Sequence, residues 1–148
     1  LIVLRTMSKW AGIAGLRVGY AIAHPYIIEH LLKVKMPYNI SAAATLGVTA
    51  SLDDVNFLLR NVNRIIDERE RVFSLLKGIS NLKAWPSKGN FILCELSGVG
   101  RQEVAESLAR NGVFVRMPSS TRLKNCFRVS IGTSKQTDVF MSALRKAI

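Results

Sequence analysis

Four polar side chains near the start of the chain could together hold a phosphorylated aldehyde. Thr6 and Ser8 carry hydroxyl groups, Arg17 carries a guanidinium, and Lys9 is the amine between them. Hydroxyl and guanidinium donors suit a phosphate, because arginine forms bidentate, charge-assisted hydrogen bonds. A lysine beside another cation has its ammonium form disfavoured and becomes a nucleophile. A phosphate site with a nucleophilic lysine is the combination that binds pyridoxal phosphate as a Schiff base.

A purely structural explanation of the same residues stays open at this point. Ser-Lys pairs are common in loops, and Arg17 could lie over a sheet edge with its aliphatic stem packed. The Ser-x-x-Lys pattern of acyl enzymes is not matched, because Thr6 occupies the serine position. No glycine-rich dinucleotide motif, P-loop or zinc-protease motif occurs.

Metal and disulfide chemistry find little support. His24 and His30 are six residues apart, which is a poor spacing for two ligands on one helix. Cys94 and Cys126 are the only cysteines and lie far apart in the sequence. We therefore expect no metal site and no disulfide framework.

The chain carries a strong positive charge that is unevenly spread. It has 148 residues, 21 Lys and Arg against 10 Asp and Glu, and a net charge of +11. No acid precedes Glu29, and Asp138 is the only acid from residue 108 onward. Acid-poor basic zones favour an anionic ligand. A nucleic-acid-binding module is the remote alternative, but aromatic residues make up only 7% and the basic residues form no run.

Hydrophobic patterning predicts an α/β protein in three parts. We expect residues 1–50 to be the end of a large parallel or mixed sheet domain, 51–78 a bridging helix and 79–148 a small α+β domain. Ser51 and Asp54 resemble a capping box at the start of that helix. The predicted strands are 1–4, 17–23, 82–85, 90–96, 113–116 and 126–131, and the other predicted helices are 25–35, 42–50, 102–111 and a last one capped by Ser134.

The opening residues, Leu1 to Leu4, are typical of a buried strand, which needs neighbours on both sides. We therefore expect these residues to be part of a longer protein, and to be inactive and poorly folded alone. The sequence shows no signal peptide and no apolar stretch long enough for a transmembrane helix.

Five segments resemble the fold-type-I aminotransferases, and among them the histidinol-phosphate aminotransferase family. The first, RTMSKWAGIAGLRVGY (residues 5–20), is similar to the segment that carries the cofactor lysine. The others follow in the family's order over the whole chain. They are MPYNIS (36–41), SKGNFIL (87–93), GVFVR (112–116) and CFRVSIGT (126–133).

The resemblance implies roles for individual residues. Lys9 matches the lysine that binds pyridoxal phosphate and moves the substrate proton. Arg116 and Arg128 match two arginines that hold the anionic end of the substrate, and Asn90 matches a residue near them. From the residues alone, these arginines could equally lie on the solvent face of a strand. Thr6, Ser8 and Arg17 match residues that hold the cofactor phosphate.

The resemblance also implies a reaction. We expect transfer of the amino group of histidinol phosphate to 2-oxoglutarate by a homodimeric enzyme, in the cytoplasm or, in a plant, the plastid. Other aminotransferases, acting on aromatic or acidic amino acids, and phospho-amino-acid decarboxylases are the alternatives. The family's aspartate at the pyridine nitrogen has no counterpart in this chain.

Overall fold

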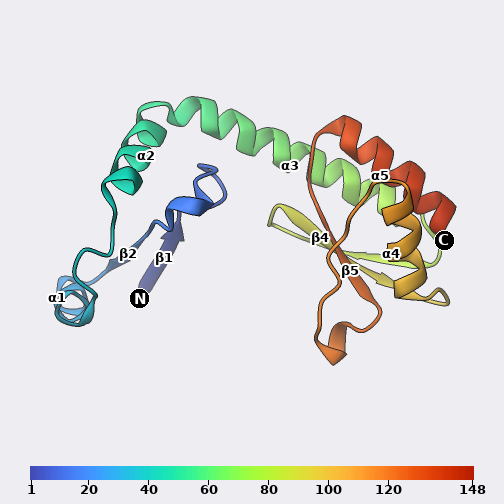
Figure 1. Ribbon diagram of the computed structural model, residues 1–148, viewed down its shortest axis with the longest axis horizontal. Helices are drawn as coiled ribbons and strands as arrows, with labels where there is room; N and C mark the ends of the chain where they lie inside the picture. The colour runs from blue at the N-terminus through green and yellow to red at the C-terminus, as the bar shows by residue number, and fades with distance from the viewer. The chain divides into compact units, whose positions relative to one another are not determined.

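The computed structural model describes all 148 residues, which form two compact units, Leu1–Val62 and Asn63–Ile148. Each is described by itself. Helix α3 (Val55–Lys77) begins in the first unit and continues into the second (Figure 1). The division into 1–50, 51–78 and 79–148 remains a prediction, since the boundary between the compact units lies within a helix.

The first unit is built around an antiparallel hairpin. Strand β1 (Ile2–Thr6) pairs with β2 (Gly19–Ala23), with Ile2 opposite Ala23 and Thr6 opposite Gly19. A short 3-10 turn, η1 (Ala14–Leu16), lies in the connection. The sheet has two strands, and Ile2 and Leu4 are 50% and 75% exposed. The neighbours that a buried strand needs are therefore not among these residues, and its burial stays a prediction for a longer protein.

Two helices complete this unit, and local capping explains where they begin. Helix α1 (Pro25–Val34) has proline in its first turn, where no donor is lost. Helix α2 (Ala42–Asp53) is capped by Ser41, whose hydroxyl accepts a hydrogen bond from the amide of Ala44 at 3.1 Å. The capping box predicted at Ser51 was wrong. Ser51 lies inside α2 and its hydroxyl donates to the carbonyl of Gly47, so α3 begins only after Asp54.

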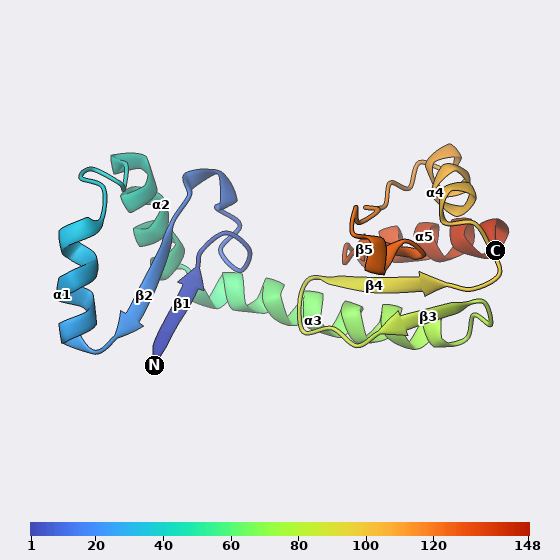
Figure 2. The same cartoon turned by 90° about the horizontal axis from the view of Figure 1, so that it is seen from below.

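The second unit is a three-stranded antiparallel sheet with helices on one face. Strands β3 (Leu82–Trp85), β4 (Phe91–Leu96) and β5 (Cys126–Ser130) lie in that order, and Figure 2 shows β3 and β4 beside the later turns of α3. Burial alternates along β4, so one face joins the core and the other carries half-buried side chains. The core also contains residues of α3, α4 (Arg101–Arg110) and α5 (Ser134–Ala147), among them Val72, Leu76, Val104, Leu108, Phe140 and Leu144.

Two local predictions in this unit need correction. The predicted strand 113–116 is not formed; only Arg116 pairs with β5, as an isolated bridge. The last helix is capped by Thr133 rather than Ser134, because Thr133 and Gln136 form a reciprocal capping box. The predicted strands β2 to β5 and helix α4 are confirmed to within about two residues.

None of the helices combines the length and the apolar character that crossing a lipid bilayer requires.

Candidate functional site

The turn that follows β1 gathers hydroxyl groups. The Thr6 hydroxyl donates to the Ser8 hydroxyl over 2.8 Å, and the amide of Ser8 donates to Thr6 Oγ1 over 3.1 Å. These local bonds tighten the chain directly after the strand, as short hydroxyl side chains commonly do in turns. The structure therefore brings Thr6 and Ser8 together, with both hydroxyls at the surface of this unit.

Arg17 is held next to this turn through the backbone. Its own φ of 55° is left-handed, which is uncommon for a residue with a Cβ, and its guanidinium donates to the carbonyl of Ala14 over 2.9 Å. The next residue, Val18, accepts a hydrogen bond from the amide of Met7 over 3.1 Å. Gly19 completes the close approach, because a Cβ there would lie 2.7 Å from the carbonyl oxygen of Arg5.

Lys9 follows these hydroxyls by one residue and its ammonium is uncommitted. Its side chain is exposed and takes part in none of the four ion pairs and in no side-chain hydrogen bond. Its carbonyl accepts from the amide of Gly12, which fixes the backbone of the turn. The donor set of this unit is therefore two hydroxyls, a guanidinium and an amine, with no carboxylate before Glu29. That set fits the phosphate and the aldehyde of pyridoxal phosphate.

Arg116 and Arg128 form the second group of charges. Their backbones exchange two hydrogen bonds, of 3.0 Å and 2.7 Å, so the two residues lie directly opposite each other. Directly opposed residues of an antiparallel pair project to the same face. Two like charges in that arrangement are destabilising. An anion bound between them would remove that repulsion.

The two arginines differ in their surroundings. Arg116 is exposed, whereas Arg128 is half-buried, with its guanidinium 4.8 Å from the centre of the Phe91 ring. Neither forms an ion pair. Asn90 is exposed at the start of β4, and its carbonyl accepts from the amide of Ile131 just beyond β5. It thus lies near the same end of β5 as Ser130, two residues after Arg128.

The seven predicted site residues therefore form two groups, one in each unit. Sequence reasoning missed two further residues, Phe91 and Arg101. The guanidinium of Arg101 donates to backbone carbonyls of the segment between Arg116 and Arg128. Phe91 could have been found from strand alternation, but no spacing rule connects Arg101 to carbonyls 17 to 25 residues away.

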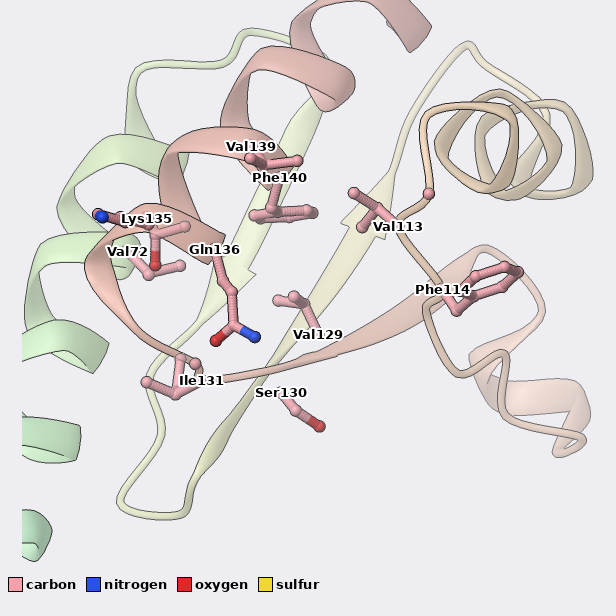
Figure 3. Close-up of a pocket in the computed structure, with 13 residues that line it drawn as sticks. Val72, Val113, Phe114, Val129, Ser130, Ile131, Lys135, Gln136, Val139 and Phe140 are labelled. Carbon is pink, nitrogen blue, oxygen red and sulfur yellow. The ribbon is translucent and has the colours of Figure 1, made fainter.

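A cavity lies elsewhere in the second unit. It has a volume of about 560 Å³, and none of the predicted site residues lines it. Figure 3 shows the side chain of Gln136, at the start of α5, beside Val129, with Val139 and Phe140 further along the same helix. Its walls are mainly apolar, and Gln136 is already used to cap α5. Lys135 is the one cation among its lining residues, whereas the second candidate group has two arginines.

Comparison with known proteins shows to which family the chain belongs. Residues 1–144 match the family described as aminotransferase class I and II. The chain belongs to this family. It is 40% identical over 149 residues to a histidinol-phosphate aminotransferase of Roseiflexus castenholzii, covering 99% of this chain and 40% of that protein. Histidinol-phosphate aminotransferase 1, chloroplastic, of Arabidopsis thaliana is 46% identical over 147 residues, covering 99% of this chain and 35% of that protein.

Solved structures agree on the fold, which is part of the fold-type-I aminotransferase fold. The histidinol-phosphate aminotransferase of Sinorhizobium meliloti in complex with pyridoxal-5'-phosphate matches with a TM-score of 0.83 and 27% identity, over 99% of this chain and 40% of that one. An L-threonine-O-3-phosphate decarboxylase of Porphyromonas gingivalis has a TM-score of 0.86 at 20% identity, over 99% of this chain and 46% of that one. The chain thus spans less than half the length of these relatives.

Proposed function

We propose that the protein is a pyridoxal-phosphate-dependent aminotransferase that converts histidinol phosphate and 2-oxoglutarate to imidazole acetol phosphate and glutamate. The observation that carries this is the uncommitted amine of Lys9 one residue after the linked hydroxyls of Thr6 and Ser8, in a chain of the aminotransferase class I and II family. The identity of 40% and 46% to two histidinol-phosphate aminotransferases supports the choice of substrate.

The first unit would hold the cofactor. Thr6, Ser8 and Arg17 would bind its phosphate, because hydroxyl and guanidinium donors match phosphate oxygens. Lys9 Nζ would bind its aldehyde carbon. When bound, pyridoxal phosphate acts as an electron sink for the amino-bearing carbon of the substrate. Lys9 Nζ, once released, would take the proton from that carbon as a general base.

The second unit would hold the anionic end of each substrate. Arg116 and Arg128 project to one face, and their mutual repulsion is relieved when an anion lies between them. A guanidinium accepts a phosphate or a carboxylate with the same planar pair of donors. The arginines would therefore serve histidinol phosphate and 2-oxoglutarate in turn. Asn90 would add a polar contact at the same end of β5.

The location and assembly of the protein follow by analogy. Relatives from Arabidopsis thaliana and Nicotiana tabacum are named as chloroplastic, so we assign the protein to the plastid if it comes from a plant and to the cytoplasm otherwise. We also propose a homodimer, as the resemblance implies.

Turnover by the protein expressed from the complete gene tests this function. Histidinol phosphate, phenylalanine and aspartate are offered as amino donors with 2-oxoglutarate, and glutamate is measured. We expect the highest kcat/KM with histidinol phosphate, and a loss of about 10²- to 10⁴-fold in the Lys9→Ala variant. Faster turnover of phenylalanine, release of carbon dioxide, or full activity of Lys9→Ala would contradict the proposal.

A further inference from the structure

We infer that Phe91 is a positioning residue for Arg128, with the face of its ring holding the guanidinium in the orientation that meets the substrate anion. This inference rests on the proposed function. Phe91 lies opposite Ser130 and Leu93 lies opposite Arg128, so Phe91 and Arg128 are diagonal neighbours on one face of the sheet. The guanidinium carbon is 4.8 Å from the ring centre, within the range of a cation–π contact.

The Phe91 ring is the group of this chain that interacts electrostatically with the Arg128 guanidinium. No carboxylate pairs with Arg128, and its Nε is buried without a hydrogen-bond partner. A buried donor without a partner is costly, and the negative face of an aromatic ring offsets part of that cost. Because Nε is enclosed, the two terminal nitrogens are left to meet a ligand. Replacing the ring by an aliphatic side chain would remove what orients them.

The turn before β4 makes room for this placement. A Cβ at Gly89 would lie 3.2 Å from Cε1 of Phe91, closer than side chains normally pack. The carbonyl of Gly89 accepts a hydrogen bond of 3.3 Å from the guanidinium of Arg69, which is itself only 6% exposed. The backbone at Gly89 is not left-handed, so Gly89→Ala displaces the ring without straining the main chain. Substitution at Gly89 therefore perturbs the ring without changing either partner.

The test uses the protein expressed from the complete gene, with Phe91→Leu, Phe91→Tyr and Gly89→Ala made alone and Phe91→Leu also combined with Arg128→Ala. KM for 2-oxoglutarate and kcat are measured, and inorganic phosphate is titrated by calorimetry in parallel. We expect Phe91→Leu to raise KM and the phosphate Kd about 3- to 30-fold with little change in kcat, as loss of a cation–π contact implies. Phe91→Tyr keeps a ring and should leave KM and the phosphate Kd near the wild-type values. Gly89→Ala should raise both constants by less than Phe91→Leu does. In the Arg128→Ala background, Phe91→Leu should change neither constant further.

The outcomes separate this inference from the proposed function. If Arg128→Ala raises KM and the phosphate Kd but Phe91→Leu changes neither, the inference fails and the function stands. An equal effect of Phe91→Leu in both backgrounds shows a merely structural role and also overturns it. If the wild-type protein shows no transamination, the proposed function fails, and the phosphate titration alone decides the role of Phe91. Should Phe91→Leu not fold, Gly89→Ala and Phe91→Tyr are compared instead. A higher KM and phosphate Kd in Gly89→Ala than in Phe91→Tyr supports the inference, and equal values in the two variants overturn it.

Discussion

Arg101 at the start of α4 is predicted to fix the loop that separates the two candidate substrate arginines. Its Nη1 donates to the carbonyls of Pro118 at 3.0 Å, Leu123 at 3.2 Å and Cys126 at 3.5 Å. All three acceptors lie between Arg116 and Arg128. Substituting alanine for Arg101 would release this segment at three points while leaving both candidate arginines in place.

The size of the effect follows from these distances. The contact with Pro118 has a normal N–H···O distance and the contact with Leu123 lies at the upper end of that range. The contact with Cys126 is longer and therefore weaker. A hydrogen bond to a charged group contributes about 1.5–3 kcal/mol, but Arg101 is partly exposed and water would replace it at the released carbonyls. We therefore expect Arg101→Ala to lower the free energy of unfolding by about 1–3 kcal/mol.

Urea denaturation of the protein expressed from the complete gene measures this loss, and hydrogen exchange locates it. The amides of Leu123 and Lys124, which bond to the carbonyls of Ser120 and Thr121, should exchange faster in Arg101→Ala. Arg110 lies at the other end of the same helix, is exposed and makes no side-chain contact of this kind, so Arg110→Ala is the matched control. A loss below about 0.5 kcal/mol, as for an ordinary surface substitution, with unchanged exchange in the loop would refute the reasoning.

Two further predictions concern buried groups of the second unit. Burial raises the pKa of Glu68, but hydrogen bonds from Thr137, Arg71 and Ser134 outweigh it and hold the pKa below its ordinary value of 4.5. The carboxylate therefore stabilises the fold above about pH 4.5 and loses this contribution as the pH falls through its folded pKa. The difference in free energy of unfolding between wild type and Glu68→Gln, measured by urea denaturation, should therefore shrink in acid. A difference that stays constant with pH would contradict this. Burial raises the pKa of Cys94 to about 12, so its thiol should resist a maleimide at mildly alkaline pH until the protein unfolds. Labelling is measured by mass spectrometry, and rapid labelling of the native protein would contradict this prediction.

Much of the fold could be predicted from local signals in the sequence. Pro25 and Ser41 mark helix starts through interactions within one turn, and alternation along 91–96 indicates a half-buried strand. The break at Asp54 could not be predicted, because Ser51 suits a cap as well as a helix interior and only the fold decides. Residues 113–116 carry a strand pattern but pair at one point only, which depends on the path of the following loop.

Part of the candidate site could likewise be predicted from the sequence, and part of it is visible only in the fold. The type and order of Thr6, Ser8 and Lys9 predict a phosphate and amine site, and the structure links the two hydroxyls directly. The opposition of Arg116 and Arg128 follows from pairing between distant segments and is visible only in the fold. What orients Arg128 is equally a tertiary property, since Phe91 belongs to another strand.

The central claim is that the amine of residue 9 binds pyridoxal phosphate. The protein expressed from the complete gene is incubated with the cofactor and treated with borohydride, which makes a lysine–pyridoxal bond permanent, and the modified peptide is found by mass spectrometry. The account predicts one pyridoxyl group, on Lys9, and none there in Lys9→Ala. Modification spread over the surface lysines, or confined to a lysine other than Lys9, would contradict it.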